Sequence, residues 1–161
     1  MTAIEMLKMQ HREVAALFDK LEAAASAGQR RELFNAIADA LAVHATIEER
    51  HFYPAVKNKA TDEMLLEAVE EHLEIKRAIA ELLQLDAGDK SFAAQAMMLR
   101  DEVEQHVEEE ESELFPAVEE LFDDETLESL AEAMDETQTE LLAEGNPRDA
   151  IPGETERAAP L

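Results

Sequence analysis

The chain has 161 residues, enough for one domain that buries a core without disulfides. Its 39 acidic residues and 14 Lys and Arg residues give a formal net charge of −25, which repels phosphate backbones and anionic membranes, so we expect no nucleic-acid partner. The absence of Cys excludes disulfides, thiolate metal sites and a thiol nucleophile. No apolar run approaches the roughly 20 residues of a membrane span, and the first residues lack the apolar stretch of a signal peptide. We therefore expect a cytoplasmic protein with no membrane partner.

The sequence predicts a succession of long helices joined by short turns. Only 4 Gly and 5 Pro interrupt a chain rich in Ala, Leu and Glu, a composition that favours helix. The expected helices cover residues 2–25, 29–59, 61–85, 91–122 and 124–144. We expect Thr2 and Glu5 to form a capping box at the first helix, and Pro54 to bend the second.

Short connections indicate that neighbouring helices run in opposite directions, because a short loop cannot return a helix to the parallel orientation. We therefore predict an all-α fold in which residues 1–122 form an up-down-up-down antiparallel four-helix bundle. Residues 123–145 are expected to add a C-terminal helix that covers the bundle or mediates dimerisation, and the sequence does not decide between these roles. Residues 146–161 have no apolar period and are expected to be a disordered tail.

Each of the four long helices carries one histidine in the middle of its apolar stripe. These residues are His11, His44, His72 and His106. Residues equidistant from the turn between two antiparallel helices lie at nearly the same height, because both helices rise about 1.5 Å per residue. The midpoints between successive histidines fall on or beside the expected turns, at residues 27–28, 58 and 89. The four imidazoles are therefore predicted to meet in one layer of the core.

Two glutamates are expected to join this layer. The patterns His44-x-x-x-Glu48 and His106-x-x-x-Glu110 share a spacing that places each Glu about 40° around the helix and roughly 6 Å along it from its His. Imidazoles and carboxylates that converge in an apolar interior predict a site for a borderline metal cation. Two ions fit better than one, because the paired carboxylates can bridge them. The histidines of the first two helices would then hold one ion, and those of the next two the other.

The sequence also repeats internally. The segment HATIEERHFYPAV, which starts at His44, aligns with HVEEEESELFPAV, which starts at His106. A weaker similarity relates the segments that follow His11 and His72. The predicted site therefore has approximate twofold symmetry, with one His and one His-x-x-x-Glu pattern from each half.

This ordered pattern over residues 1–122 resembles the hemerythrin-like, or HHE cation-binding, family. The resemblance implies a four-helix bundle that holds a non-haem di-iron centre. The two iron ions would have carboxylate bridges and an oxo or hydroxo bridge, and would react with O2, peroxide or nitric oxide. The implied metal ligands are His11, His44, Glu48, His72, His106 and Glu110.

The chain departs from the oxygen-carrying hemerythrins at two positions. Those proteins have His-x-x-x-His on the third helix, where Lys76 here follows His72, and His-x-x-x-x-Asp on the fourth. Here Glu110 and Glu111 both follow His106, and Glu110 is the better-placed bridge because Glu111 lies about 140° from His106 around the helix. Without the extra His the two metals have similar ligands and exchangeable positions, which favours redox turnover over reversible oxygen carriage.

These features favour a redox protein with a catalase-like, peroxide-dismutating activity. The alternative is a non-catalytic oxygen- or iron-binding sensor or carrier, whose stability changes with occupancy. A metal-free interaction bundle is difficult to reconcile with six convergent ligands.

The sequence leaves the roles of three further residues undecided. His51 lies about 10 Å further along the axis than His44, so we expect it to be partly exposed, the alternative being a hydrogen bond near Glu48. Tyr53 is expected to pack in the core, with a phenolate ligand or an oxidisable neighbour as the less favoured role. Lys76 is expected to extend outward, the alternative being that it neutralises an acid near the site.

Overall fold

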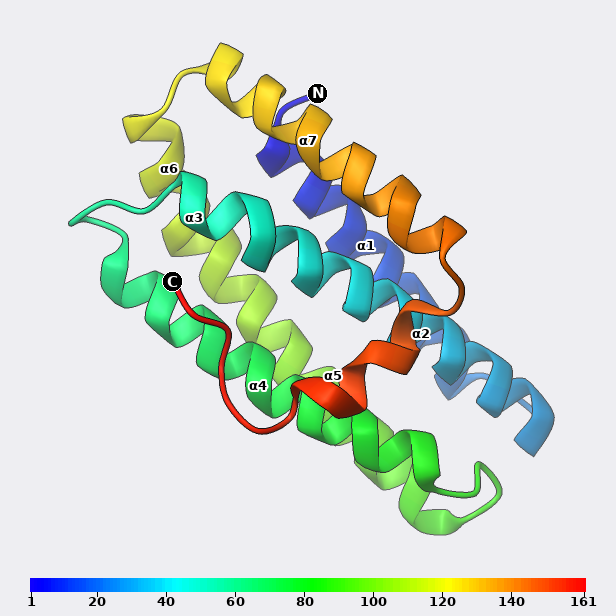
Figure 1. Ribbon diagram of the computed structural model, residues 1–161. Helices are drawn as coiled ribbons and strands as arrows, with labels where there is room; N and C mark the ends of the chain where they lie inside the picture. The colour runs from blue at the N-terminus through cyan, green and yellow to red at the C-terminus, as the bar shows by residue number, and fades with distance from the viewer.

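The computed structural model describes residues 1–161 and contains helices but no strands, so the predicted all-α class is confirmed. The longest helices are α1 (Ala3–Glu22), α2 (Ala27–Ile47), α4 (Asp62–Gln84), α5 (Lys90–Glu109) and α7 (Asp124–Ala143). The chain reverses direction between α1 and α2 and again between α4 and α5, and α7 lies outside, along α1 and α2 (Figure 1). No helix combines the length and the apolar character that crossing a bilayer requires.

Side-chain caps set the start of several helices. The Thr2 hydroxyl accepts from the Glu5 backbone N–H at 3.2 Å and the Glu5 carboxylate accepts from the Thr2 N–H at 2.9 Å, so the predicted capping box forms. The side chains of Ser26, Asp89 and Asp123 each accept from a backbone N–H in the first turn of α2, α5 and α7, respectively. Local sequence therefore decides where these helices begin.

Two wide helical turns interrupt the regular helices beside the histidine layer. The segments η1 (Glu48–Phe52) and η2 (Glu110–Leu114) have π-helical hydrogen bonding and lead into the short helices α3 (Tyr53–Ala55) and α6 (Phe115–Leu121). The second residue of each short helix is a proline, which has no N–H to donate and whose ring crowds the carbonyl four residues earlier. The chain relieves this crowding by widening the preceding turn, and both wide turns begin at a glutamate of the predicted site.

The apolar core consists of two clusters of 17 buried residues each. One contains Leu7, Phe52 and Phe115, and the other contains Phe34 and Phe92. Along α1, α4 and the continuous segments α2–η1 and α5–η2, the histidine lies between residues of the first cluster and residues of the second. A polar layer therefore separates the two halves of the core.

The C-terminal segment differs from the disordered tail that the sequence predicts. Residues Pro147–Glu154 form the 3₁₀ segment η3, which packs on α2 and α4 (Figure 1). Ile151 is only 2% exposed and belongs to the second cluster. The Arg148 side chain pairs with Asp39 at 2.8 Å, and its backbone N–H donates to the same carboxylate at 2.9 Å. One apolar anchor and two ion pairs, Arg148 with Asp39 and Glu154 with Lys76, hold the segment here, and none of them produces a periodic pattern.

Replacement of Ile151 by Ala tests this docking. Removing a buried isoleucine side chain leaves a cavity, so we expect the free energy of unfolding to fall by about 2–4 kcal/mol in urea denaturation. Leu142→Ala is the control, because Leu142 is 58% exposed and its truncation should change stability by about 0.5 kcal/mol or less. Equal stability of the Ile151→Ala variant and the original chain would show that the segment is not docked.

Candidate metal centre

Four imidazoles and two carboxylates meet in the layer between the two apolar clusters. They are the six residues that the sequence singled out, and none is more than 7% exposed: His11, His44, Glu48, His72, His106 and Glu110. The histidines come from α1, α2, α4 and α5, and the glutamates from the first positions of η1 and η2. The structure therefore brings together every residue of the predicted site.

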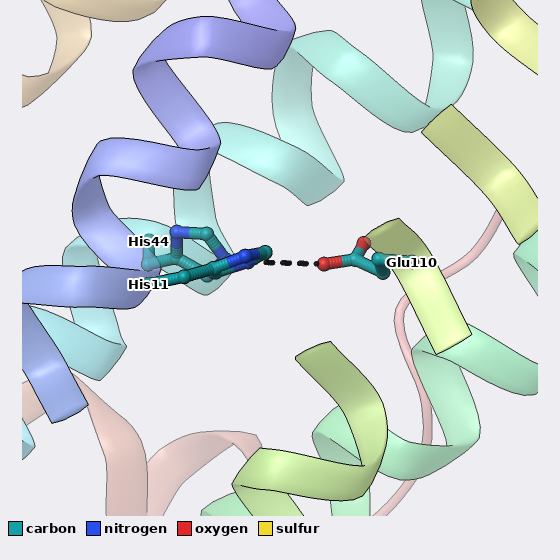
Figure 2. Close-up of side chains that lie close together, drawn as sticks. All are labelled: His11, His44 and Glu110. Atoms are coloured by element: carbon teal, nitrogen blue, oxygen red, sulfur yellow. Dashed lines mark hydrogen bonds and ion pairs between the residues drawn. The ribbon is translucent and has the colours of Figure 1, made fainter. Parts of the chain in front are cut away.

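The first half of the centre contains His11, His44 and Glu110. The Nε2 atoms of the two imidazoles lie 3.2 Å apart, and Glu110 Oε1 lies 3.3 Å from His11 Nε2. Figure 2 shows the Glu110 carboxylate directed at the two rings. One donor atom from each residue lies within 4.8 Å of the others, which is close enough for all three to bind one ion.

The second half contains Glu48, His72 and His106 in an equivalent arrangement. The two Nε2 atoms are 3.1 Å apart, and Glu48 Oε1 lies 3.2 Å from His72 Nε2. Each glutamate also reaches the other half: Glu48 Oε1 lies 3.0 Å from His44 Nε2, and Glu110 Oε1 lies 3.3 Å from His106 Nε2. Both carboxylates are therefore placed where they can bridge two cations.

Each imidazole uses its outer nitrogen, Nδ1, to contact a side-chain oxygen. The pairs are His11 with Glu111 at 2.8 Å, His44 with Gln10 at 2.8 Å, His72 with Glu49 at 2.6 Å and His106 with Glu71 at 2.9 Å. An oxygen acceptor at Nδ1 places the proton there and leaves the Nε2 lone pair facing the centre. Such outer hydrogen bonds orient the histidine ligands of metal sites.

The residues present fit a pair of cations. Both oxygens of Glu48 and Oε1 of Glu110 are buried without a hydrogen-bond partner, and four Nε2 lone pairs face them. Burying carboxylate oxygens without a partner costs several kcal/mol, on the order of a lost charged hydrogen bond each. Cations between these atoms would satisfy them. Imidazole nitrogen and carboxylate oxygen together suit iron and other borderline metals.

The glutamates of the centre keep their charge. Burial raises the pKa of Glu48, but the charge of His44 and contacts with the other imidazoles outweigh it and leave the pKa well below its usual value. Without a bound cation, burial lowers the pKa of His106, but the charge of Glu110 and contacts with the surrounding carboxylates raise it well above its usual value, so the imidazole takes up a proton that a bound cation would displace. The site is thus built to hold positive charge between its carboxylates.

Tyr53 reaches the centre with its hydroxyl group, beyond the packing role that the sequence favours. Its Oη donates to Glu110 Oε2 at 2.7 Å and lies 3.2 Å from His72 Nε2, while its ring contacts Phe52. Burial and the charge of Glu110 raise the pKa of the phenol well above its usual value, so it holds its proton. The internal repeat conceals this role, because Phe115 stands at the equivalent position.

Sequence reasoning missed the four oxygen partners of the imidazoles, although they follow a pattern. Glu49 and Glu111 come directly after the two central glutamates, and Gln10 and Glu71 come directly before His11 and His72. Each partner contacts a histidine of another helix. The repeated Glu-Glu pairs and the polar residues directly before His11 and His72 were the available signals.

Lys76 lies beside the site, whereas His51 lies away from it. Lys76 is only 8% exposed, which makes the expectation that it extends outward wrong. Its Nζ lies 2.9 Å from Glu49 and 3.0 Å from Glu154, so it neutralises an acid beside the site. His51 is half-buried and pairs with the Thr137 hydroxyl of α7 at 2.7 Å, away from the centre.

A cavity of about 420 Å³ lies beside the four imidazoles, on the side away from Glu48 and Glu110. Its apolar walls include Val14, Ile79 and Val103, and part of η3 lines its outer side. The volume exceeds what a diatomic molecule or peroxide needs. Small molecules therefore have room next to the four imidazoles.

Comparisons with known proteins agree with this geometry. The hemerythrin HHE cation binding domain matches residues 2–118. The crystal structure of a hemerythrin HHE cation binding domain-containing protein from Mycobacterium kansasii is similar with a TM-score of 0.79 and 26% sequence identity, over 94% of this chain and 97% of that one. A protein described as a DNA nickase, from Nostoc sp., is 30% identical over 114 residues, which are 71% of this chain but 32% of the relative. This chain therefore spans about a third of the nickase. The family match extends over most of the sequence, and the chain belongs to the hemerythrin HHE cation-binding domain family.

Proposed function

We propose that the chain is a non-haem di-iron protein that reacts with O2, peroxide or nitric oxide. The observation that carries this proposal is the convergence of four Nε2 lone pairs on carboxylate oxygens that have no hydrogen-bond partner. One ion would be held by His11, His44 and Glu110, and the other by Glu48 with the remaining two histidines. The adjacent cavity gives a small molecule access to both ions.

The reaction that best suits the site is dismutation of hydrogen peroxide, in which one peroxide is oxidised to O2 while a second is reduced to two molecules of water. This reaction balances without an external reductant. The two irons would supply the electron exchange, because each can change its oxidation state. The protein contributes a cavity for peroxide beside the imidazoles and a phenol proton on Tyr53, 2.7 Å from Glu110.

A non-catalytic oxygen- or iron-binding sensor or carrier is the alternative. Ions bound where four helices meet would stabilise the folded chain by mass action. The stability of the fold would then depend on how many metal sites are occupied. The DNA nickase supports no further function here. Its similarity covers a third of its length, and a net charge of −25 disfavours an approach to DNA.

Metal analysis of the purified chain tests the proposed centre. We expect close to two irons per chain, because two groups of three ligands are present. The oxidised protein should have a near-ultraviolet oxo-to-iron absorption band, recorded aerobically and anaerobically. A colourless protein that takes up only zinc would contradict the di-iron proposal.

Replacement of Glu48 by Ala tests the bridging position. Glu48 Oε1 lies within 3.2 Å of an imidazole in each half, so we expect the variant to lose at least one of two irons. Glu120→Gln, which removes an exposed charge, should keep both and controls for the change in net charge. Full retention of two irons in the Glu48→Ala variant would contradict the assigned geometry.

Oxygen evolution after addition of peroxide separates an enzyme from a sensor or carrier. We expect the iron-loaded chain to release O2, and His72→Ala to abolish the release because it removes one of only three protein ligands of an ion. Circular dichroism of the variant checks that the helices persist. A stable and reversible O2 adduct without turnover of peroxide would instead favour the carrier.

A further inference from the structure

One hydrogen-bond partner breaks the twofold symmetry of the centre. Glu71, the residue before His72, contacts Nδ1 of His106, and Gln10, the residue before His11, contacts Nδ1 of His44. Three imidazoles therefore face a carboxylate, while His44 faces a neutral amide. The exception lies in the half formed by His11, His44 and Glu110, which we call the first position. The half formed by Glu48, His72 and His106 is the second position.

The amide of Gln10 is held in place by the helix outside the bundle. Its Nε2 donates to Gln138 Oε1 of α7 at 2.6 Å, which turns its Oε1 toward His44 Nδ1 at 2.8 Å. Gln10 is 9% exposed, so little water competes for these bonds. Packing of α7 thus fixes the orientation of the Gln10 amide, so that a neutral oxygen acceptor stays behind His44.

The carboxylate side chains that accept from the Nδ1 atoms also differ in how much they are exposed to solvent. The Glu111 side chain behind His11 is 35% exposed, whereas the Glu49 and Glu71 side chains behind His72 and His106 are 12% and 24% exposed. A carboxylate at Nδ1 makes an imidazole a stronger electron donor at Nε2, and solvent weakens that effect. The second position therefore has two better-shielded carboxylates, and the first has one more exposed carboxylate and one amide.

Tyr53 and Lys76 also affect how strongly the two positions attract a cation. Tyr53 donates a hydrogen bond to Glu110, but Glu110 Oε1 lies 3.3 Å from an imidazole of each position, so this bond weakens the attraction for a cation at both positions alike. Lys76 pairs with Glu49, the acceptor behind His72, and shares its charge with Glu154, so it offsets part of the effect of Glu49. The outer acceptors therefore decide the comparison: a carboxylate lies behind each imidazole of the second position and an amide behind His44, which favours a cation at the second position.

We propose that Gln10 makes the two metal positions unequal, so that the second position fills first and the first position holds the exchangeable ion. Gln10 acts through His44 and is a positioning residue. This inference rests on the proposed function only in requiring that the six residues bind two cations. Changing an outer hydrogen-bond partner of a metal-bound histidine typically alters affinity by about 10–100-fold, so we expect a similar ratio between the two dissociation constants.

A titration of the full metal-free chain with Co²⁺, followed by visible absorption, tests the proposal. We expect two resolved binding steps, and Gln10→Glu should strengthen the weaker step by about tenfold or more while leaving the tighter step unchanged. Gln138 can turn its amide to donate to the new carboxylate, so the α7 contact is preserved. Gln29→Glu adds the same charge at an exposed site far from the centre and should change neither step.

Removing one histidine from each half assigns the steps. His44→Ala should eliminate the weaker step, and His106→Ala should eliminate the tighter one. The reverse assignment, two equal steps in the original chain, or an unchanged weaker step in Gln10→Glu would each overturn the inference and leave the two-metal site standing. Binding of fewer than two Co²⁺ ions by the original chain would instead overturn the two-metal site itself.

Discussion

The structure is organised around negative charge and lone pairs that are buried at the middle of a helical core. Glu48 and Glu110 have almost no exposure to solvent, yet three of their four oxygens receive no hydrogen bond. Such groups destabilise a folded protein unless a positive charge lies between them. The surrounding structure meets this requirement in two ways: η1 and η2 bring the carboxylates inward, and the side-chain acceptors at Nδ1 orient the imidazoles.

The wide turns and the two apolar clusters have complementary effects on the centre. The clusters lie above and below the histidine layer and fix the heights of the helices by close packing. In each of the turns η1 and η2, two adjacent glutamates both contact histidines of the centre. In η1, for example, Glu48 faces the centre while Glu49 holds His72 from behind. One short segment therefore supplies both a candidate metal ligand and the hydrogen-bond partner of a second candidate ligand.

Much of the centre could be predicted because its causes are local or periodic. The histidines share an apolar stripe, the turns between them are marked by Gly, Asp and Thr, and the capping box at Thr2 follows from four residues of sequence. The contacts that could not be predicted depend on single side chains from distant segments. Gln10 meets Gln138, and Lys76 meets Glu154, only after the chain is folded. The apolar contact of η3 comes from Ile151, and one apolar residue has no period.

The placement of η3 affects how fast the interior exchanges molecules with solvent. This segment lines the cavity beside the imidazoles, yet its anchors are few and near the end of the chain. Segments of this kind open with a smaller free energy than the global unfolding of a domain. Detachment of about ten residues would uncover the cavity while the long helices and their histidines stay in register. Access to the centre and integrity of the fold are therefore governed by separate equilibria.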